Sequence, residues 1–458
     1  MRLLIIFLIG VSLLSIKHAE AQAINPRLSA SEIQSFLPQT RSAFTFPSPY
    51  NTKGIRLTIP SDCNNADCVQ YVGYSYWRNI NNHVGTNILY AFITLRNNGG
   101  PTLFSYNKNT DVVTKVGPLF PLTNPFSSST GEGWYFSAKV PHDLYIYRSV
   151  DTKFYRYDII TKNLETVLDI ATRQDLFASN KYLWQMHSSD DDLVHAGTIR
   201  NNGDSRMLGC FVYNESTGRY SYYPTRGNLD ECNLDASGRW LIILEDNDNR
   251  VIDLNTGTEE TLRDEDGALG HLDMGYGYAV GADNYNPRIN ATVVLKFPLK
   301  ENNPRVVHSN PDWNTAEANH VSHQNRKPGV PESQYACGSN LDSVSGRENE
   351  IVCFPLDGSG KEMAIAPVMG SISASGGRDS YSKAPKANLD ITGEYVIWTT
   401  NTLGNRLDAY IAKVPKEKIT GDTSSSIIRD LQEQINRLKE MIRLLIEAIS
   451  RGQIVVRL

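Results

Sequence analysis

A short pattern of hydrophobic and polar positions recurs along this chain: an apolar or aromatic strand, a polar turn and a second short strand. The first copy reads YNKNTDVVTKV and the fourth reads IDLNTGTEETL. Successive copies start 51, 56, 39, 45, 57 and 56 residues apart. The copies lie at residues 106–116, 157–168, 213–223, 252–262, 297–307, 354–365 and, in truncated form, 410–415. Self-similarity at this period indicates a solenoid, a propeller or another repeat array.

The composition of the copies favours strands over helices. They are rich in Tyr, Val, Ile and Thr, with Asn, Asp and Gly in the turns, and these residues are typical of strands and hairpins. The sequence therefore predicts an all-β fold, a seven-bladed β-propeller with about four strands in each blade. Because the seventh copy is truncated, we expect a strand near residues 55–59 to complete the last blade and seal the ring.

A heptad pattern follows the last copy. Seven apolar residues are spaced alternately 3 and 4 apart: Ile428, Leu431, Ile435, Leu438, Ile442, Leu445 and Ile449. This predicts a C-terminal coiled-coil-like α-helix over residues 427–451. Ile at a and Leu at d favour a parallel dimer, and Met441 and Ile446 widen the stripe enough to leave a trimer open. The alternative is a helix packed on its own propeller.

The N-terminus has the pattern of a signal peptide. Arg2 precedes an apolar run at residues 3–16, and Ala19-Glu20-Ala21 forms a cleavage site. The run of about 14 residues is shorter than the roughly 20 needed to span a bilayer. We therefore expect a secreted, cell-surface or periplasmic protein. The predicted division is 1–21 signal peptide, 22–58 N-terminal arm, 59–415 β-propeller, 416–426 linker, 427–451 helix and 452–458 tail.

Two local patterns refine this division. Residues 29–37, SASEIQSFL, predict a short helix after a serine cap. Residues 70–77, QYVGYSYW, alternate as a strand does.

Cysteine usage agrees with export. The chain has six cysteines, and six allow 15 connectivities. Pairing between neighbours in sequence is the simplest choice. It gives three disulfides: Cys63–Cys68, Cys210–Cys232 and Cys337–Cys353. A zinc site is disfavoured because the chain lacks CxxC pairs. The net charge of −5 implies no general attraction to nucleic acid or anionic lipid.

A second internal repeat carries a family resemblance. LDASGRWLII at residues 234–243 matches LDITGEYVIW at residues 389–398. Together with the phrase IDLNTG, it resembles the SPDGRYI…DLxTG pattern of TolB-like and WD40-like β-propellers, over about residues 157–415. Proteins of that group are binding scaffolds, and a few, such as the oligogalacturonate lyases, are enzymes. The resemblance implies the fold well and the function poorly.

A polar cluster is the best candidate for a site. Segments that lead into the innermost strand of each blade line the central channel, and two of them carry imidazoles. The candidate residues at this channel mouth are His271, Asp273, His320, His323 and Gln324. Asp379 and Lys386 precede another inner strand and are further candidates. Imidazole and carboxylate suit Zn or Mn, so His271, His320 and His323 are candidate metal ligands. The alternative is that these side chains only tie strands together.

Other features bear on ligands. Trp313, in a long segment with little strand pattern, is a candidate platform for a sugar or a peptide side chain. Asn214 and Asn290 begin N-glycosylation sequons. The chain has no GxSxG, HExxH or Walker motif.

The favoured hypothesis is a secreted propeller that binds a glycan or protein and is oligomerised by its C-terminal helix. The alternative is a metal-dependent uronate lyase or a hydrolase acting at the channel mouth.

Overall fold

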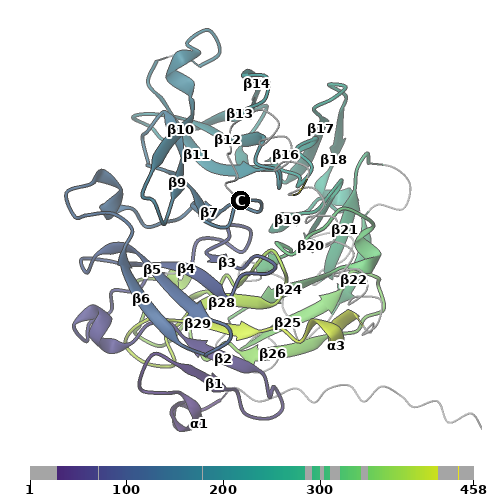
Figure 1. Cartoon of the computed structure of the whole chain (residues 1–458). Coiled ribbons are helices and arrows are strands. Elements are labelled where there is room, and N and C mark those ends of the chain that lie inside the picture. Colours follow the sequence, from purple (N-terminus) through teal and green to yellow (C-terminus); the bar gives the residue numbers. More distant parts are fainter. Residues whose placement is uncertain are drawn as a thin grey trace, which may run out of the picture.

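The chain forms a ring of seven antiparallel β-sheets around a central axis (Figure 1). This computed structural model describes residues 28–70, 72–177, 179–283, 291–299, 304–309, 320–341, 349–420 and 442. Six sheets have four strands and one has five. The prediction of a seven-bladed all-β propeller is therefore confirmed.

The blades follow one another along the chain, innermost strand first. Blade 1 contains β3 (Ile80–Asn81), β4 (Ile88–Leu95), β5 (Gly100–Asn107) and β6 (Val113–Pro118). Blade 2 contains β7 (Tyr135–Phe136), β8 (Asp143–Tyr147), β9 (Lys153–Asp158) and β10 (Leu164–Asp169). Blade 3 contains β11 (Lys181–Ser188), β12 (Val194–Asn201), β13 (Met207–Asn214) and β14 (Arg219–Pro224). Blade 4 contains β15 (Leu229–Leu234), β16 (Trp240–Glu245), β17 (Asp248–Asp253) and β18 (Glu259–Leu262).

The remaining blades close the ring. Blade 5 contains β19 (Leu272–Met274), β20 (Tyr278–Asp283), β21 (Ala291–Lys296) and β22 (Arg305–Ser309). Blade 6 contains β23 (His320–Ser322), β24 (Tyr335–Ser339), β25 (Glu350–Pro355) and β26 (Met363–Pro367). Blade 7 contains β27 (Asn388–Leu389), β28 (Tyr395–Thr400) and β29 (Asp408–Lys413), joined by β2 (Lys53–Arg56) and β1 (Ala43–Thr45) from the N-terminal arm.

The recurring phrase is the hairpin between the third and fourth strands of a blade. Its first copy spans the turn from β5 to β6, and its fourth spans the turn from β17 to β18. The seventh copy is truncated because the next strand of that sheet comes from the N-terminal arm. There Ile55 pairs with Ile411 and Arg56 with Tyr410. The expected ring closure is thus present, with β2 a few residues earlier than expected.

Neighbouring blades bury their faces against each other. Phe92 of blade 1 packs on Trp134 and Phe136 of blade 2, with ring centroids 6.2 and 5.7 Å apart. Tyr106 of blade 1 packs on Tyr395 of blade 7, with ring centroids 6.1 Å apart. A single four-stranded sheet cannot hide its own apolar faces, so each blade depends on the next.

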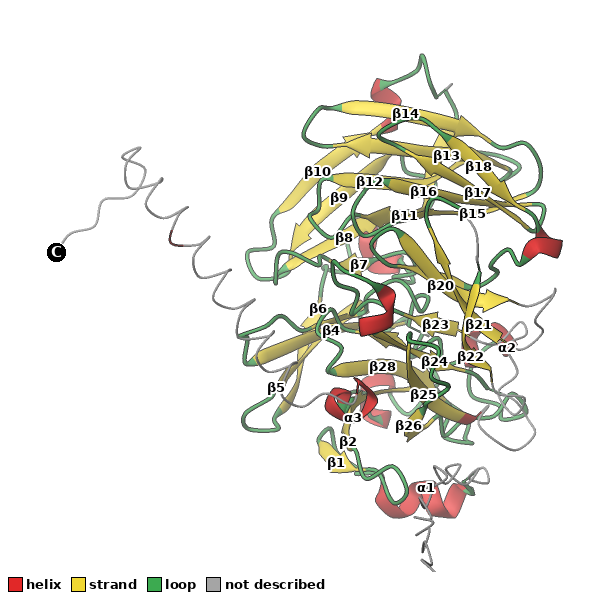
Figure 2. Cartoon of the chain, turned by 90° about the vertical axis from the view of Figure 1, so that its right-hand side faces the viewer, coloured by secondary structure: helices red, strands yellow, loops and turns green. Residues whose placement is uncertain are grey.

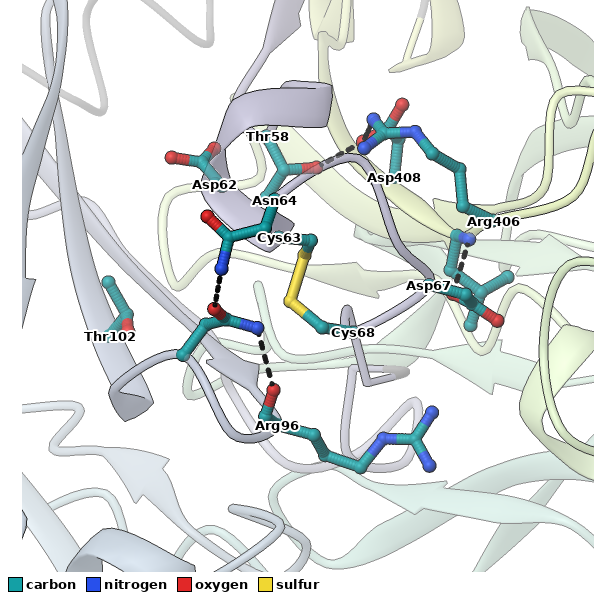
Figure 3. The surroundings of a disulfide bond; sticks show 12 residues. Thr58, Asp62, Cys63, Asn64, Asp67, Cys68, Arg96, Thr102, Arg406 and Asp408 are labelled. Carbon is teal, nitrogen blue, oxygen red and sulfur yellow. Dashed lines mark hydrogen bonds and ion pairs between the residues drawn. A yellow bond between two sulfur atoms is a disulfide. The ribbon is translucent and has the colours of Figure 1, made fainter.

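All three predicted disulfides form. Cys63–Cys68 closes a loop that links the N-terminal arm to blades 1 and 7 (Figure 3). In that loop Asn64 Nδ2 donates to Asn98 Oδ1 at 3.0 Å, and Leu407 N donates to Asp67 Oδ1 at 2.9 Å. The loop therefore adds a side-chain clasp to the strand pairing that closes the ring.

Short helices lie outside the sheets. Helix α1 (Ala30–Phe36) matches the predicted helix and begins with a capping box: Glu32 N donates to Ser29 Oγ at 3.3 Å, and Ser29 N donates to Glu32 Oε2 at 2.7 Å. It lies at the outer rim beside β1 (Figure 2). The others are α2 (Ser380–Lys383) and α3 (Lys416–Thr420). Among the described residues, no helix is long and apolar enough to cross a membrane.

Two predicted segments, the signal peptide and the C-terminal helix, lie largely or wholly outside the described residues. The signal peptide at residues 1–21 lies outside the described residues, and so does the 427–451 helix apart from Ile442. Both remain predictions.

Candidate functional site

The innermost strands of the seven blades, β3, β7, β11, β15, β19, β23 and β27, surround the axis. Residues 72–79 precede β3 and contact several of these blades. We call residues 72–79 the plug. The strand-like alternation at 70–77 predicted a strand, and this is wrong: the described part has turns and bends and no strand. The alternation arises because the plug is buried on all sides, so its aromatic residues face several blades rather than one.

The plug is fixed by polar contacts to several blades. Trp77 Nε1 donates to Met186 O at 3.0 Å, in blade 3. Arg78 Nε donates to Phe136 O at 2.9 Å, in blade 2. Asn79 N donates to Asn388 Oδ1 at 3.2 Å, in blade 7. These contacts hold the plug's aromatic rings at one mouth of the channel.

Two of the predicted histidines meet on the plug. The rings of His271 and His320 stack, with centroids 4.8 Å apart. The ring of Tyr74 lies edge-on to both, at 5.6 and 4.6 Å respectively. His320 is buried, and burial holds its pKa well below the usual value, with smaller contributions from the charges of His271 and Lys386. The half-buried His271 is the member of this pair nearer to solvent.

A buried carboxyl group lies next to this pair, and sequence reasoning missed it. Glu231, on β15, accepts a hydrogen bond from the Tyr76 hydroxyl and one from Asn233 Nδ2 at 3.1 Å. Burial, together with the smaller effect of the neighbouring Asp230 charge, raises its pKa to about 7. Glu231 therefore exchanges a proton near neutral pH, as a general acid or base must.

A buried amine completes the mouth. Lys386 precedes β27, and burial lowers its pKa to about 7. Its Nζ donates to the carbonyl of Tyr381 and lies 3.7 Å from the centroid of that residue's ring. The Tyr381 hydroxyl donates to Glu132 Oε1, in the loop before blade 2, at 3.0 Å. A side chain from blade 7 thus reaches a loop of blade 2 above the channel.

Two further predicted residues, Asp273 and Gln324, belong to a separate layer, the inner network, with members from blades 3, 5 and 6 and from the plug. Its members are Arg78, Asp190, Asp273, Gln324 and Arg326. Gln324 Nε2 donates to Asp273 Oδ1 at 2.6 Å, and Arg78 Nη1 donates to Gln324 Oε1 at 2.5 Å. Arg326 bridges Asp273 at 3.2 Å and Asp190 at 2.9 Å. Asp273 and Gln324 are therefore held by hydrogen bonds within the protein.

His323 also has its own partners. Its Nε2 lies 2.7 Å from the Tyr278 hydroxyl, and its Nδ1 lies 2.9 Å from the carbonyl oxygen of Tyr335. Both ring nitrogens are engaged, so His323 does not converge with His271 and His320. Among the described residues, no group of three or more His, Cys, Asp or Glu side chains is arranged to hold a metal ion. The site as described does not fit the predicted metal centre.

An acidic cleft of about 590 Å³ adjoins the mouth between blades 4 and 5. Asp230 and His271 belong to both the cleft and the mouth. The acidic side chains that line it are Asp230, Glu245, Asp246, Asp248 and Asp264.

Other predicted residues lie elsewhere. Trp313 and Asn290 fall outside the described residues. Asn214 ends β13, and its Oδ1 accepts a hydrogen bond from Thr217 N at 3.0 Å. The platform and glycosylation predictions remain predictions.

Comparisons with known proteins identify a fold and no family. No protein-family model and no curated protein matches this sequence. The structure is similar to that of an oligogalacturonate lyase from Vibrio parahaemolyticus, with a TM-score of 0.57 and 11% identity over 83% of this chain and 98% of the other. It is also similar to an oligogalacturonate lyase in complex with manganese, with a TM-score of 0.56 and 13% identity over the same shares.

A third structure, TolB from Acinetobacter baumannii, gives a TM-score of 0.37 and 10% identity over 72% of this chain and 81% of that one. At these identities the likeness concerns the fold alone. The likeness to the two oligogalacturonate lyase structures thus confirms the propeller fold, and the function stays unassigned.

Proposed function

We propose that this chain is a glycan-binding β-propeller whose ligand sits at the channel mouth. The observation that carries the proposal is Tyr381, an aromatic side chain 43% exposed at the mouth. Aromatic faces stack on sugar rings, while nearby polar groups select their hydroxyls. The Tyr381 hydroxyl donates to Glu132, and the exposed Asp230 and half-buried His271 line the adjoining cleft. A glycan is favoured over a protein ligand because the adjoining cleft, which includes Asp230 and His271, is lined mainly by polar and acidic side chains.

Binding to a panel of oligosaccharides is the direct test. Tyr381→Ala should weaken binding about tenfold or more, whereas Tyr381→Phe, which keeps the ring face, should retain most of it. Leu122→Ala changes a side chain that is 77% exposed and lies outside the mouth, so it serves as the surface control. Equal binding by wild type and Tyr381→Ala would contradict a glycan site here.

One observation favours a second candidate, an enzyme that cleaves acidic polysaccharides as a lyase or hydrolase. Glu231 and Lys386 both have a pKa of about 7, which suits proton transfer, and such groups concentrate at active sites. Two structures of the same fold are oligogalacturonate lyases. Because the described residues do not gather metal ligands, the chemistry of this candidate is proposed on proton transfer by Glu231 and Lys386.

The two candidates separate in one assay. The purified chain is incubated with oligogalacturonides, with and without added Mn²⁺, and both unsaturated products and new reducing ends are measured. Turnover that is lost in Glu231→Gln would establish the enzyme. Binding of oligogalacturonides without any product would reject the enzyme and support the glycan-binding protein.

Export and oligomerisation are part of the proposal. Three disulfides suit an oxidising compartment, which supports export through the predicted signal peptide. The heptad seam supports a homo-oligomer. The mass in solution of the full mature chain should be two or three times that of a version ending at Pro415; equal monomeric masses would refute the oligomer.

A further inference from the structure

Lys386 lies in an unusual position for a lysine. Its side chain is 0% exposed, although lysine is almost never fully buried. Its backbone has φ of +43°, in the left-handed region that bulky residues rarely adopt. Strained backbone of this kind is retained where the surrounding structure fixes a side chain in a particular place. The surrounding structure therefore holds the Lys386 amine in a fixed position at the channel mouth.

Tyr381 covers the amine. The ring centroid lies 3.7 Å from Nζ, and the ring's own hydroxyl is tied to Glu132 at 3.0 Å. That hydrogen bond joins exposed groups, so water competes for it and opening costs only about 1 kcal/mol. Rotation of the Tyr381 side chain would uncover Nζ toward solvent. The Tyr381 ring can therefore move away from the amine at little cost in free energy.

The environment favours the neutral amine. A ring face attracts the ammonium form, but burial outweighs this and lowers the pKa to about 7. The charged or titratable groups that face the amine are Glu132, Asp379, His320 and Tyr381. An exposed lysine, with a pKa near 10.4, is neutral in only about one molecule in a thousand at pH 7. A desolvated, neutral lysine is the usual nucleophile toward carbonyl compounds.

We propose that Lys386 is a carbonyl-reactive lysine that forms an imine with a small aldehyde, including the open-chain aldehyde of a reducing sugar, when Tyr381 moves aside. The Nζ lone pair attacks the carbonyl carbon, two protons pass from nitrogen to the carbonyl oxygen, and water leaves as the C=N bond forms. The step is reversible and needs no oxidant or reductant. The reactivity of Lys386 is independent of the proposed glycan-binding function. The identification of a sugar as the natural aldehyde rests on that function.

Reductive trapping tests the proposal on the whole chain. The protein is incubated at pH 7 with glycolaldehyde and sodium cyanoborohydride, which reduces the imine to a stable secondary amine, and the modified lysines are located by peptide mass spectrometry. Lys386 should be modified at least tenfold faster than Lys383, a lysine of the same segment whose Nζ donates to Ile372 O at 2.9 Å. Modification of Lys386 at the rate of Lys383 or slower would overturn the proposal.

Variants sharpen the test. Tyr381→Ala should increase the trapping rate at Lys386 several-fold, and Lys383→Arg should leave it unchanged. An unchanged rate in Tyr381→Ala would overturn the covering role of the tyrosine. Lys386→Gln separates the two proposals, because it removes the reactive amine without placing a permanent charge in the buried position. If the oligosaccharide panel gives no binding but Lys386 is still trapped, the glycan proposal fails and the reactive lysine stands.

Discussion

The channel holds two layers of buried ionisable groups, and they differ in what surrounds them. In the inner network, Arg326 lies between two carboxylates, those of Asp190 and Asp273. At the mouth, Glu231 receives hydrogen bonds from neutral groups, the Tyr76 hydroxyl and the Asn233 amide. Opposite charges compensate burial far better than neutral donors do.

The surroundings of each group determine whether it keeps its charge or exchanges a proton near neutral pH. Arg326 keeps its charge because two carboxylates face it, and their charges raise its pKa against the effect of burial. Glu231 has no such compensation within the described contacts, so burial brings its pKa to about 7. The inner network therefore ties the blades together with fixed charges, whereas the mouth holds groups that gain and lose protons near neutral pH. The same ring of strands supports both layers.

Removal of Arg326 should give the largest effect. Arg326→Met leaves the buried carboxylate of Asp273 without its cation, while Asp190 still faces Arg78 at 3.9 Å. Breaking a buried ion pair from one side costs about 3–5 kcal/mol. The free energy of unfolding, measured by urea denaturation, should fall by that amount.

An exposed pair provides the control. Arg173 and Asp175 are 2.6 Å apart at the surface, where water and salt screen the pair, so Arg173→Met should leave the free energy of unfolding nearly unchanged. Similar losses in the two variants would remove the distinction between a fixed inner network and ordinary surface charges.

The sequence predicted the blades because hairpin chemistry is local. The turn at 234–240 contains Asp235, whose Oδ1 accepts hydrogen bonds from Arg239 N and Trp240 N at 2.8 and 2.9 Å, and Gly238 with φ of 72°. The matching turn before β28 repeats this chemistry with Asp390 and Gly393. The disulfides were predictable because each joins neighbours in sequence.

The site was only partly predictable because it is assembled across the ring. Placement of segments before inner strands correctly brought His271 and His320 together, and Lys386 was a candidate on the same grounds. Glu231 gave no signal, because nothing in its flanking residues shows that it faces a tyrosine 155 positions away. The plug was misassigned because alternating aromatic residues look the same on a strand and on a segment buried on all sides.

The pH dependence of stability distinguishes the mouth from the inner network. The pKa of Glu231 rises from 4.5 to about 7 on folding, so the folded state binds more protons between these values. Stability from this group is full below pH 4.5 and is lost as pH rises through 7, by about 3 kcal/mol in total. Glu231→Gln removes this loss. Its stability relative to wild type should therefore increase from pH 5 to pH 8, as measured by urea denaturation.

Glu245 is a matched control for that measurement. It is as buried as Glu231 but lies 3.0 Å from Arg250. Glu245→Gln should show no comparable gain at pH 8. A gain of equal size in both variants would mean that the pKa of Glu231 is not raised by its position at the mouth.

The smallest expected effect concerns the hydroxyl that holds Glu231. Tyr76→Phe removes that donor while keeping the ring that packs 4.7 Å from Tyr74 and 5.3 Å from His187. A hydrogen bond to an ionised carboxylate contributes more than one to a neutral carboxyl. The variant should therefore lose about 1 kcal/mol at pH 5 and about 2 kcal/mol at pH 8, again by urea denaturation. Tyr74→Phe, on the neighbouring ring of the plug, is the control for general repacking. A loss in Tyr76→Phe that is the same at both pH values would show that Glu231 does not ionise in this range, and the mouth would then resemble the inner network in having a fixed protonation state.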